Sequence, residues 1–141
     1  MHRGWWTELG QGMAVGSVLV GKRRMATAEA GTFEVEYQDD VAVVRLFGEH
    51  DISTSDLLRV EFERHPEDGI VVSLTETEFL DSSVVHELFA VHEWLRARNR
   101  QLVLHAATAS IVRRVLELSG LSAALPCTGS LEQAIEFARP R

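Results

Sequence analysis

Residues 70–99 read IVVSLTETEFLDSSVVHELFAVHEWLRARN, a segment in which two hydrophobic patterns follow one another. Residues 70–74 are a short, mostly apolar run, which predicts a buried strand. Apolar residues then recur at helical spacing, and they are Val84, Val85, Leu88, Val91 and Leu95. A strand followed by a helix of ten or more residues is typical of a βαβ unit, which implies a mainly parallel sheet with right-handed crossovers.

The residues before this segment predict a β-hairpin and a first helix. Phe33, Val35 and Tyr37 alternate with polar residues, the pair at 39–40 supplies a turn, and residues 41–47 are rich in β-branched and aromatic side chains. An S-x-x-D capping signal at Ser53 opens an amphipathic helix. Pro66 and Gly69 then end it.

The residues after it predict further alternation of strands and helices. Residues 102–104 form another apolar strand, and a helix beginning near Ile111 ends at Gly120, where a left-handed C-cap favours glycine. A last short strand is predicted at 125–127, before a capping box of Ser130 and Gln133 that opens a final helix. We therefore predict a single α/β domain with a mainly parallel, four- to five-stranded mixed sheet, an N-terminal hairpin and about four helices.

The domain is predicted to cover residues 31–141, preceded by a poorly ordered extension at 1–30 that lacks a regular pattern. Cys127 is the only cysteine among 141 residues, so no intrachain disulfide is possible and the cytoplasm is the expected compartment. The formal net charge of −7 is spread along the chain, which argues against a nucleic-acid partner. No apolar run approaches the roughly 20 residues of a membrane helix, so direct insertion into a membrane is not expected.

The residues FLDSSVV at 79–85 place a carboxylate and two hydroxyls before the long helix. One interpretation is helix capping, because Asp81 or a serine can accept hydrogen bonds from free N–H groups and an acid suits the helix dipole. The other interpretation is a functional site at the start of the helix. The motif alone leaves both open.

Several segments, in their order and spacing, resemble the STAS domain of bacterial anti-sigma factor antagonists. They are GEHDIST at 48–54, VVSL at 71–74, FLDSS at 79–83, LVL at 102–104, VRRVLELSGL at 112–121 and GSLEQA at 129–134. The resemblance runs from about residue 33 to residue 138, and residues 1–30 lie outside it. It implies a STAS fold and a protein that binds other proteins and is not an enzyme.

The resemblance also implies partners and site residues. Ser83 matches the serine that the anti-sigma factor, itself a serine kinase, phosphorylates, and a PP2C-type phosphatase resets the modified form. The unmodified protein binds the anti-sigma factor and so frees the sigma factor. The partner-binding surface is expected to contain Glu49, Asp51, Asp81, Ser82, Ser83 and Val84. A monomer is expected when the protein is free.

Two positions depart from the family pattern. The family usually has an acid where Ser73 stands, and a glycine where Val84 follows the second hydroxyl. A β-branched residue adds bulk beside Ser83, where a kinase must approach. The alternative is therefore a STAS adaptor subunit of a transporter or signalling scaffold that is never phosphorylated.

The sequence offers candidates for a catalytic site and for a metal site, and each has a simpler interpretation. Ser83, His86 and an aspartate suggest a hydrolase triad, but there is no G-x-S-x-G elbow. His86 and His92 lie six residues apart, which places them about 240° apart around a helix, and H-E-x-x-H is absent. His50 is expected in a solvated loop. No phosphate-cradling glycine loop occurs, so the chain is not expected to bind ATP itself. We predict no catalytic residues, metal or cofactor.

Overall fold

The computed structural model describes residues 18–20, 23–27, 31–38, 40–50, 52–64 and 69–139. Its centre is one mixed sheet whose strands lie side by side in chain order. The strands are β1 (Val18–Val20), β2 (Arg23–Thr27), β3 (Gly31–Gln38), β4 (Val41–His50), β5 (Gly69–Leu80), β6 (Leu102–His105) and β7 (Cys127–Thr128). The pairs from β1 to β4 are antiparallel, and those from β4 to β7 are parallel.

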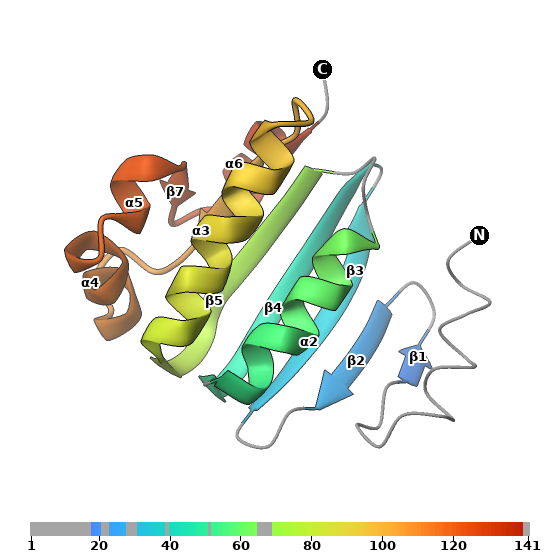
Figure 1. Cartoon of the computed structure of the whole chain (residues 1–141), viewed down its shortest axis with the longest axis horizontal. Coiled ribbons are helices and arrows are strands. Elements are labelled where there is room, and N and C mark those ends of the chain that lie inside the picture. The colour runs from blue at the N-terminus through green and yellow to red at the C-terminus, as the bar shows by residue number, and fades with distance from the viewer. Residues whose placement is uncertain are drawn as a thin grey trace.

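Helices connect the parallel strands and follow the last of them (Figure 1). They are α2 (Ile52–Glu63), α3 (Ser82–Arg96), α4 (Ile111–Leu118), α5 (Leu121–Ala124) and α6 (Leu131–Ala138). The predicted α/β class and mixed sheet are confirmed, and the five strands from Gly31 onward match the upper predicted number. The sequence did not predict the single turn of α5, and α2 begins at Ile52, one residue before the predicted capping serine.

Strands β1 and β2 extend the sheet at its antiparallel edge, within the segment predicted to be a poorly ordered extension. Residues 18–20 and 23–27 pair with each other and with β3, and the poorly ordered extension at residues 1–30 stays a prediction. The rest of that segment lies outside the described residues. The domain boundary at residue 31 stays a prediction.

The predicted hairpin is confirmed, with β3 and β4 paired in antiparallel register from Gly31 opposite Gly48 to Gln38 opposite Val41. Its alternating pattern directs Phe33, Val35 and Leu46 into the main core. The turn glycine predicted at 120 is also confirmed, since Gly120 has a φ of 85°. Such a left-handed conformation costs glycine little, because it has no Cβ.

The main core lies between one face of the sheet and helices α2 and α3, with α4 and α5 beside them (Figure 1). The apolar side chains of α3 recur at helical spacing, and Val84, Leu88 and Leu95 are fully buried. The core also contains Leu58 and Phe62 from α2. This packing fixes α2 and α3 side by side across the sheet.

The opposite face of the sheet is covered by α6, which packs on Val41, Val43, Val71 and Val103. Helix α6 begins as the capping signal predicted, because the Ser130 hydroxyl accepts a hydrogen bond from the Gln133 N–H at 3.2 Å. Within the described residues, no helix is long and apolar enough to cross a bilayer.

Candidate protein-binding site at the start of helix α3

Asp81 stands between β5 and α3 and caps the helix. Its carboxylate oxygen Oδ2 accepts hydrogen bonds from the Ser83 N–H at 3.1 Å and from the Ser83 hydroxyl at 2.7 Å. These bonds favour the ionised carboxylate, so they lower the pKa of Asp81, with the Ser83 hydroxyl as the largest cause. The same aspartate therefore caps the helix and holds the Ser83 hydroxyl in place.

The three residues after Asp81 differ in exposure. Ser82 is exposed, Ser83 is partly exposed, and Val84 is fully buried in the main core. Both serines thus reach the surface. The side chain of Val84 faces the core, so the bulk that the sequence predicted beside Ser83 points inward, because position 84 belongs to the apolar stripe of α3.

Glu49 lies beside this helix start, because β4 and β5 are parallel neighbours and their carboxyl ends meet at one edge. Glu49 is exposed and stands in register with Phe79, two residues before Asp81. The Asp81 N–H donates to the His50 carbonyl at 2.9 Å, which ties the end of β4 to the start of α3. The structure therefore brings together Glu49, Asp81, Ser82 and Ser83, whereas Asp51 lies outside the described residues.

His50 is not the solvated loop residue that the sequence predicted. It is the last residue of β4, its side chain is fully buried, and its Nε2 lies 2.9 Å from the Phe47 carbonyl oxygen. Successive side chains of a strand point to opposite faces, so an exposed Glu49 is followed by a buried His50. The buried imidazole therefore contributes to the packing at the end of β4.

The hydrolase and metal alternatives gain no support from the described residues. The Ser83 hydroxyl donates to Asp81 rather than to an imidazole, and His86 is exposed. His92, by contrast, is partly buried. No group of three or more metal-ligating side chains occurs in the part of the chain that the structure describes.

The family model for STAS domains matches residues 32–134. The chain belongs to the STAS domain family. This confirms the resemblance seen in the sequence, and the matched segment includes both β4 and the start of α3, where the candidate site lies.

Relatives of this STAS domain include the anti-sigma F factor antagonist of Paenibacillus polymyxa, which is 30% identical over 97 residues, covering 66% of this chain and 82% of the relative. Among solved structures, an anti-sigma factor antagonist from Mycobacterium paratuberculosis is similar at a TM-score of 0.67 and 28% identity, covering 77% of this chain and 94% of that one. The anti-sigma factor antagonist SpoIIAA is 25% identical. Its unphosphorylated form has a TM-score of 0.64, covering 74% of this chain and 94% of SpoIIAA. Its phosphorylated form, solved from Bacillus, has a TM-score of 0.59, covering 74% and 97%.

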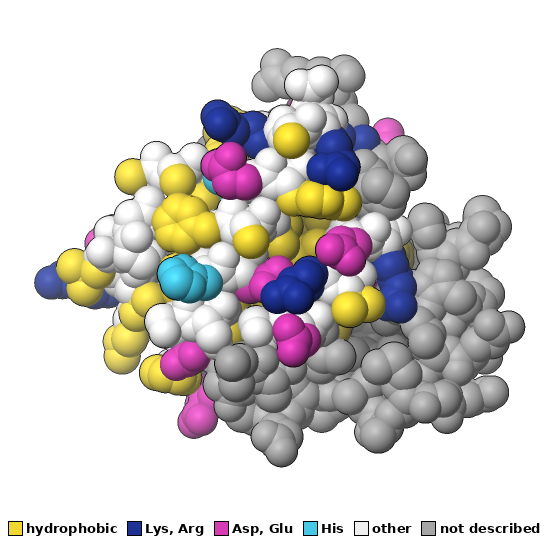
Figure 2. All heavy atoms as spheres, in the orientation of Figure 1, with side chains coloured by type: hydrophobic (Ala, Val, Ile, Leu, Met, Phe, Trp, Pro, Cys, Tyr) yellow, Lys and Arg dark blue, Asp and Glu magenta, His cyan; other side chains and the backbone are white. Residues whose placement is uncertain are grey.

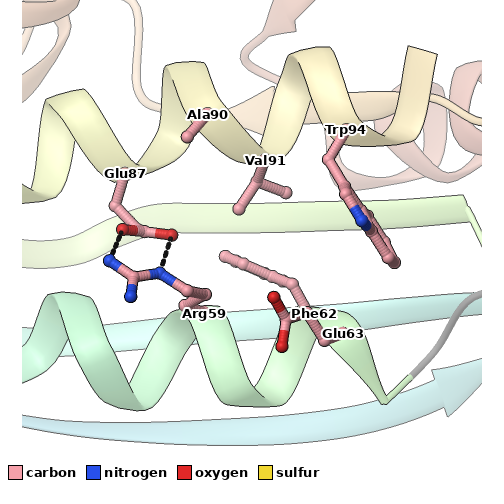
Figure 3. A pocket seen from close by; sticks show the side chains of 7 residues that line it. All are labelled: Arg59, Phe62, Glu63, Glu87, Ala90, Val91 and Trp94. Carbon is pink, nitrogen blue, oxygen red and sulfur yellow. Dashed lines mark hydrogen bonds and ion pairs between the residues drawn. The ribbon is translucent and has the colours of Figure 1, made fainter. Parts of the chain in front are cut away.

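Sequence reasoning missed a second feature of this STAS domain, a pocket of about 130 Å³ between α2 and α3 (Figure 3). Arg59 on α2 binds Glu87 on α3 through two hydrogen bonds, from Nε at 3.1 Å and from Nη2 at 2.9 Å. This pair raises the pKa of Arg59, chiefly through the hydrogen bond to Glu87. The available signal in the sequence was an acidic residue, Glu87, within the apolar pattern of α3. In the structure its side chain is buried, with 7% exposed.

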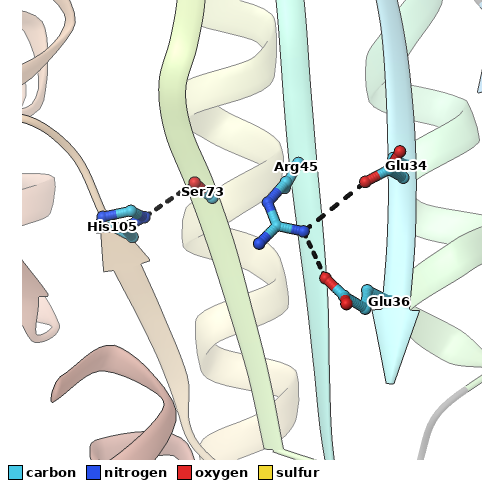
Figure 4. A network of polar contacts seen from close by, with 5 residues as sticks. All are labelled: Glu34, Glu36, Arg45, Ser73 and His105. Atoms are coloured by element: carbon cyan, nitrogen blue, oxygen red, sulfur yellow. Dashed lines mark hydrogen bonds and ion pairs between the residues drawn. The ribbon is translucent and has the colours of Figure 1, made fainter. Parts of the chain in front are cut away.

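A polar network also crosses the sheet of this STAS domain, in line with the valines beneath α6 (Figure 4). Ser73 is buried, and its hydroxyl lies 2.9 Å from Nδ1 of His105 on the neighbouring strand. On the other side, Arg45 pairs with Glu34 and Glu36. Burial lowers the pKa of His105, whose ring contacts the Ser73 hydroxyl.

Proposed function

We propose that this STAS domain protein is an anti-sigma factor antagonist whose binding is switched by phosphorylation of Ser83. The observation that carries the proposal is the partly exposed Ser83 hydroxyl, held at the surface by Asp81 at the start of α3. The names of the relatives, one of them solved in a phosphorylated form, support the same assignment. The protein acts by binding and has no catalytic step of its own.

The docking surface consists of Glu49, Asp81, Ser82 and Ser83, together with Asp51. Its partner is an anti-sigma factor with serine kinase activity. In the modification step the Ser83 Oγ–P bond forms as the bond to the γ-phosphate of ATP breaks, ADP leaves, and the serine proton is lost. A PP2C-type phosphatase hydrolyses the phosphate ester and restores the hydroxyl. The free protein is a monomer in the cytoplasm.

Electrostatics explain how phosphate would release the partner. A phosphate adds about −1.5 to −2 charges at neutral pH beside the acidic side chains of the docking surface. Within the protein the start of a helix tolerates an anion, because its dipole and free N–H groups favour negative charge. Against a docked partner, like charges can cost several kcal/mol, and about 1.4 kcal/mol is tenfold in affinity. The fold therefore persists while the complex dissociates.

Mass spectrometry of the protein after incubation with ATP and its affinity-captured partners tests this function. We expect one phosphate on Ser83, absent in Ser83→Ala and retained in Ser82→Ala, which removes the neighbouring hydroxyl as a matched control. Phosphorylation should weaken binding by at least about tenfold. A partner that binds while Ser83 stays unmodified would overturn the switch and point to the constitutive STAS adaptor.

A further inference from the structure

The Arg59–Glu87 pair lies on the helix face that also carries Ser83. Ser83 and Glu87 are four residues apart on α3, so they occupy adjacent turns on one face, with Cβ atoms about 5–6 Å apart. Residues 90 and 94, which line the α2–α3 pocket, continue the same stripe along α3. Ser83 is therefore at the N-terminal end of the row that faces α2.

Helix α2 runs in the same direction as α3, because both follow strands of the parallel part of the sheet, and Figure 3 shows their residue numbers increasing together. Arg59 extends from α2 toward α3 and is 53% exposed. Glu87 lies one turn after Ser83 on α3 and reaches across to this guanidinium (Figure 3). The guanidinium is therefore bound about one helical turn from Ser83.

The guanidinium still has donors to offer. Glu87 occupies the edge formed by Nε and Nη2, whereas Nη1 and the second hydrogen of Nη2 lie outside that pair. Among the described residues, the other contact of this group is an ion pair from Nη2 to Asp56 at 3.6 Å, with an aspartate side chain that is 79% exposed. Such exposed pairs contribute little, so Asp56 is a weak competitor for a stronger anion.

The charged side chains that act on Arg59 are acidic. Figure 2 shows, on the face formed by α2 and α3, a basic side chain flanked by acidic ones. Asp56, Glu63 and Glu87 all act on Arg59 electrostatically. A phosphate on Ser83 would add to this negative charge, and Arg59 is the cation that binds Glu87 one turn away on α3.

Phosphorylation also changes what Ser83 can do with Asp81. The Ser83 hydroxyl donates to the Asp81 carboxylate at 2.7 Å, and a phosphate ester has no proton on that oxygen. The hydrogen bond is therefore lost and replaced by repulsion between two anions. The phosphate group is therefore expected to turn away from Asp81.

We propose that Arg59 binds the phosphate group of phosphorylated Ser83 through Nη1 and Nη2 while its Nε and Nη2 keep Glu87. This inference rests on the proposed modification of Ser83 and adds its receptor within the same chain. A planar guanidinium suits the task, because its fork of donors matches phosphate oxygens and one group can bridge two anions. The phosphorylated state is then an ordered state in which α2 and α3 are linked through the phosphate.

The test installs phosphoserine at position 83 during translation, by an expanded genetic code, so that no kinase is needed. Phosphorus NMR then follows the titration of the phosphate in the full chain. An unperturbed phosphoserine has a second pKa of about 6, and a cation in contact lowers it. We expect Arg59→Gln to raise the pKa of the phosphate by about 1 unit relative to the unsubstituted chain. Arg96→Gln, which removes an exposed arginine paired with Glu93 farther along α3, should leave it unchanged.

Two further variants separate phosphate binding from a loss of packing. Arg59→Gln leaves Glu87 buried without its partner, so Arg59→Gln combined with Glu87→Gln removes both charges. The double variant should still raise the phosphate pKa, but by less than Arg59→Gln alone, because the negative charge of Glu87 is also gone. Arg59→Lys keeps the charge without the fork and should restore part of the lowered pKa. Equal phosphate titrations with and without Arg59 would overturn the inference. Because the phosphate is installed directly, this result is independent of whether an anti-sigma factor phosphorylates Ser83.

Discussion

At the scale of single residues, Asp81 links stability to function. Its carboxylate caps α3 through the Ser83 N–H and also holds the Ser83 hydroxyl in place. An uncharged hydroxyl is compatible with this carboxylate, whereas a phosphate at the same atom is repelled by it. If Ser83 is phosphorylated as proposed, the residue that positions its hydroxyl would also repel the phosphate.

Asp81→Asn keeps a capping side chain but removes the charge, and we expect a lower urea midpoint than the unsubstituted protein at pH 7. The folded state lowers the pKa of Asp81, so this contribution is present above about pH 4 and is lost as the pH falls through the folded-state pKa. The difference between the two proteins should therefore be constant above about pH 4 and shrink as the pH falls below it. Ser82→Ala is the control, and a difference that is independent of pH would contradict this account.

At the scale of elements, α6 packs closely against β5 because residue 69, a glycine, has no side chain. A Cβ added at Gly69 would lie 1.7 Å from the backbone oxygen of Ala138, the last residue of α6. Backbone cannot turn aside as a side chain can, so α6 would have to shift on the sheet. Since α6 covers four valines of that face, the shift would disturb the whole second core.

We expect Gly69→Ala to destabilise the protein by about 1–3 kcal/mol, the usual cost of overpacking a well-packed contact. Gly129→Ala is the matched control, because its added Cβ would meet the Thr108 hydroxyl at 3.2 Å, and a side chain can move. Urea unfolding followed by circular dichroism measures both. Equal stabilities of the two variants would show that α6 is not held as closely as the structure indicates.

At the scale of the whole molecule, the residues that stabilise the fold and those of the candidate docking surface lie in different parts of the domain. The main core lies between the sheet and α2, α3, α4 and α5, while the candidate docking surface lies at the carboxyl ends of β4 and β5. A charge added at that edge does not enter the core. Under the proposed function, this separation would let a phosphate alter binding without unfolding the domain.

Leu88→Ala tests the contribution of the main core. Leu88 is fully buried, and truncating a buried leucine removes its contacts and leaves a cavity, so we expect a loss of about 2–5 kcal/mol in the free energy of unfolding. Val60→Ala truncates a 43% exposed side chain on α2. That control should change the free energy of unfolding by less than about 0.5 kcal/mol in urea titrations. A small effect at Leu88 would mean that α3 contributes little to the core.

Much of this protein could be predicted from local patterns in the sequence. The hairpin at β3 and β4, the apolar stripe of α3, the turn at Gly120 and the cap at Ser130 were predicted correctly. Each depends on residues close together in the chain, where side-chain period and backbone conformation leave few choices. The motif at Asp81 was also visible as polar residues at a helix start.

Other features arise only when distant segments are brought together. Arg59 and Glu87 are 28 residues apart, and Ser73 and His105 are 32 residues apart, so no local pattern could pair them. The burial of His50 likewise follows from how the end of the strand packs, and not from residue type. Periodicity assigns a side chain to one face of its element. Which residue of another element stands opposite depends on the register and angle of packing, and these are set by the fold as a whole.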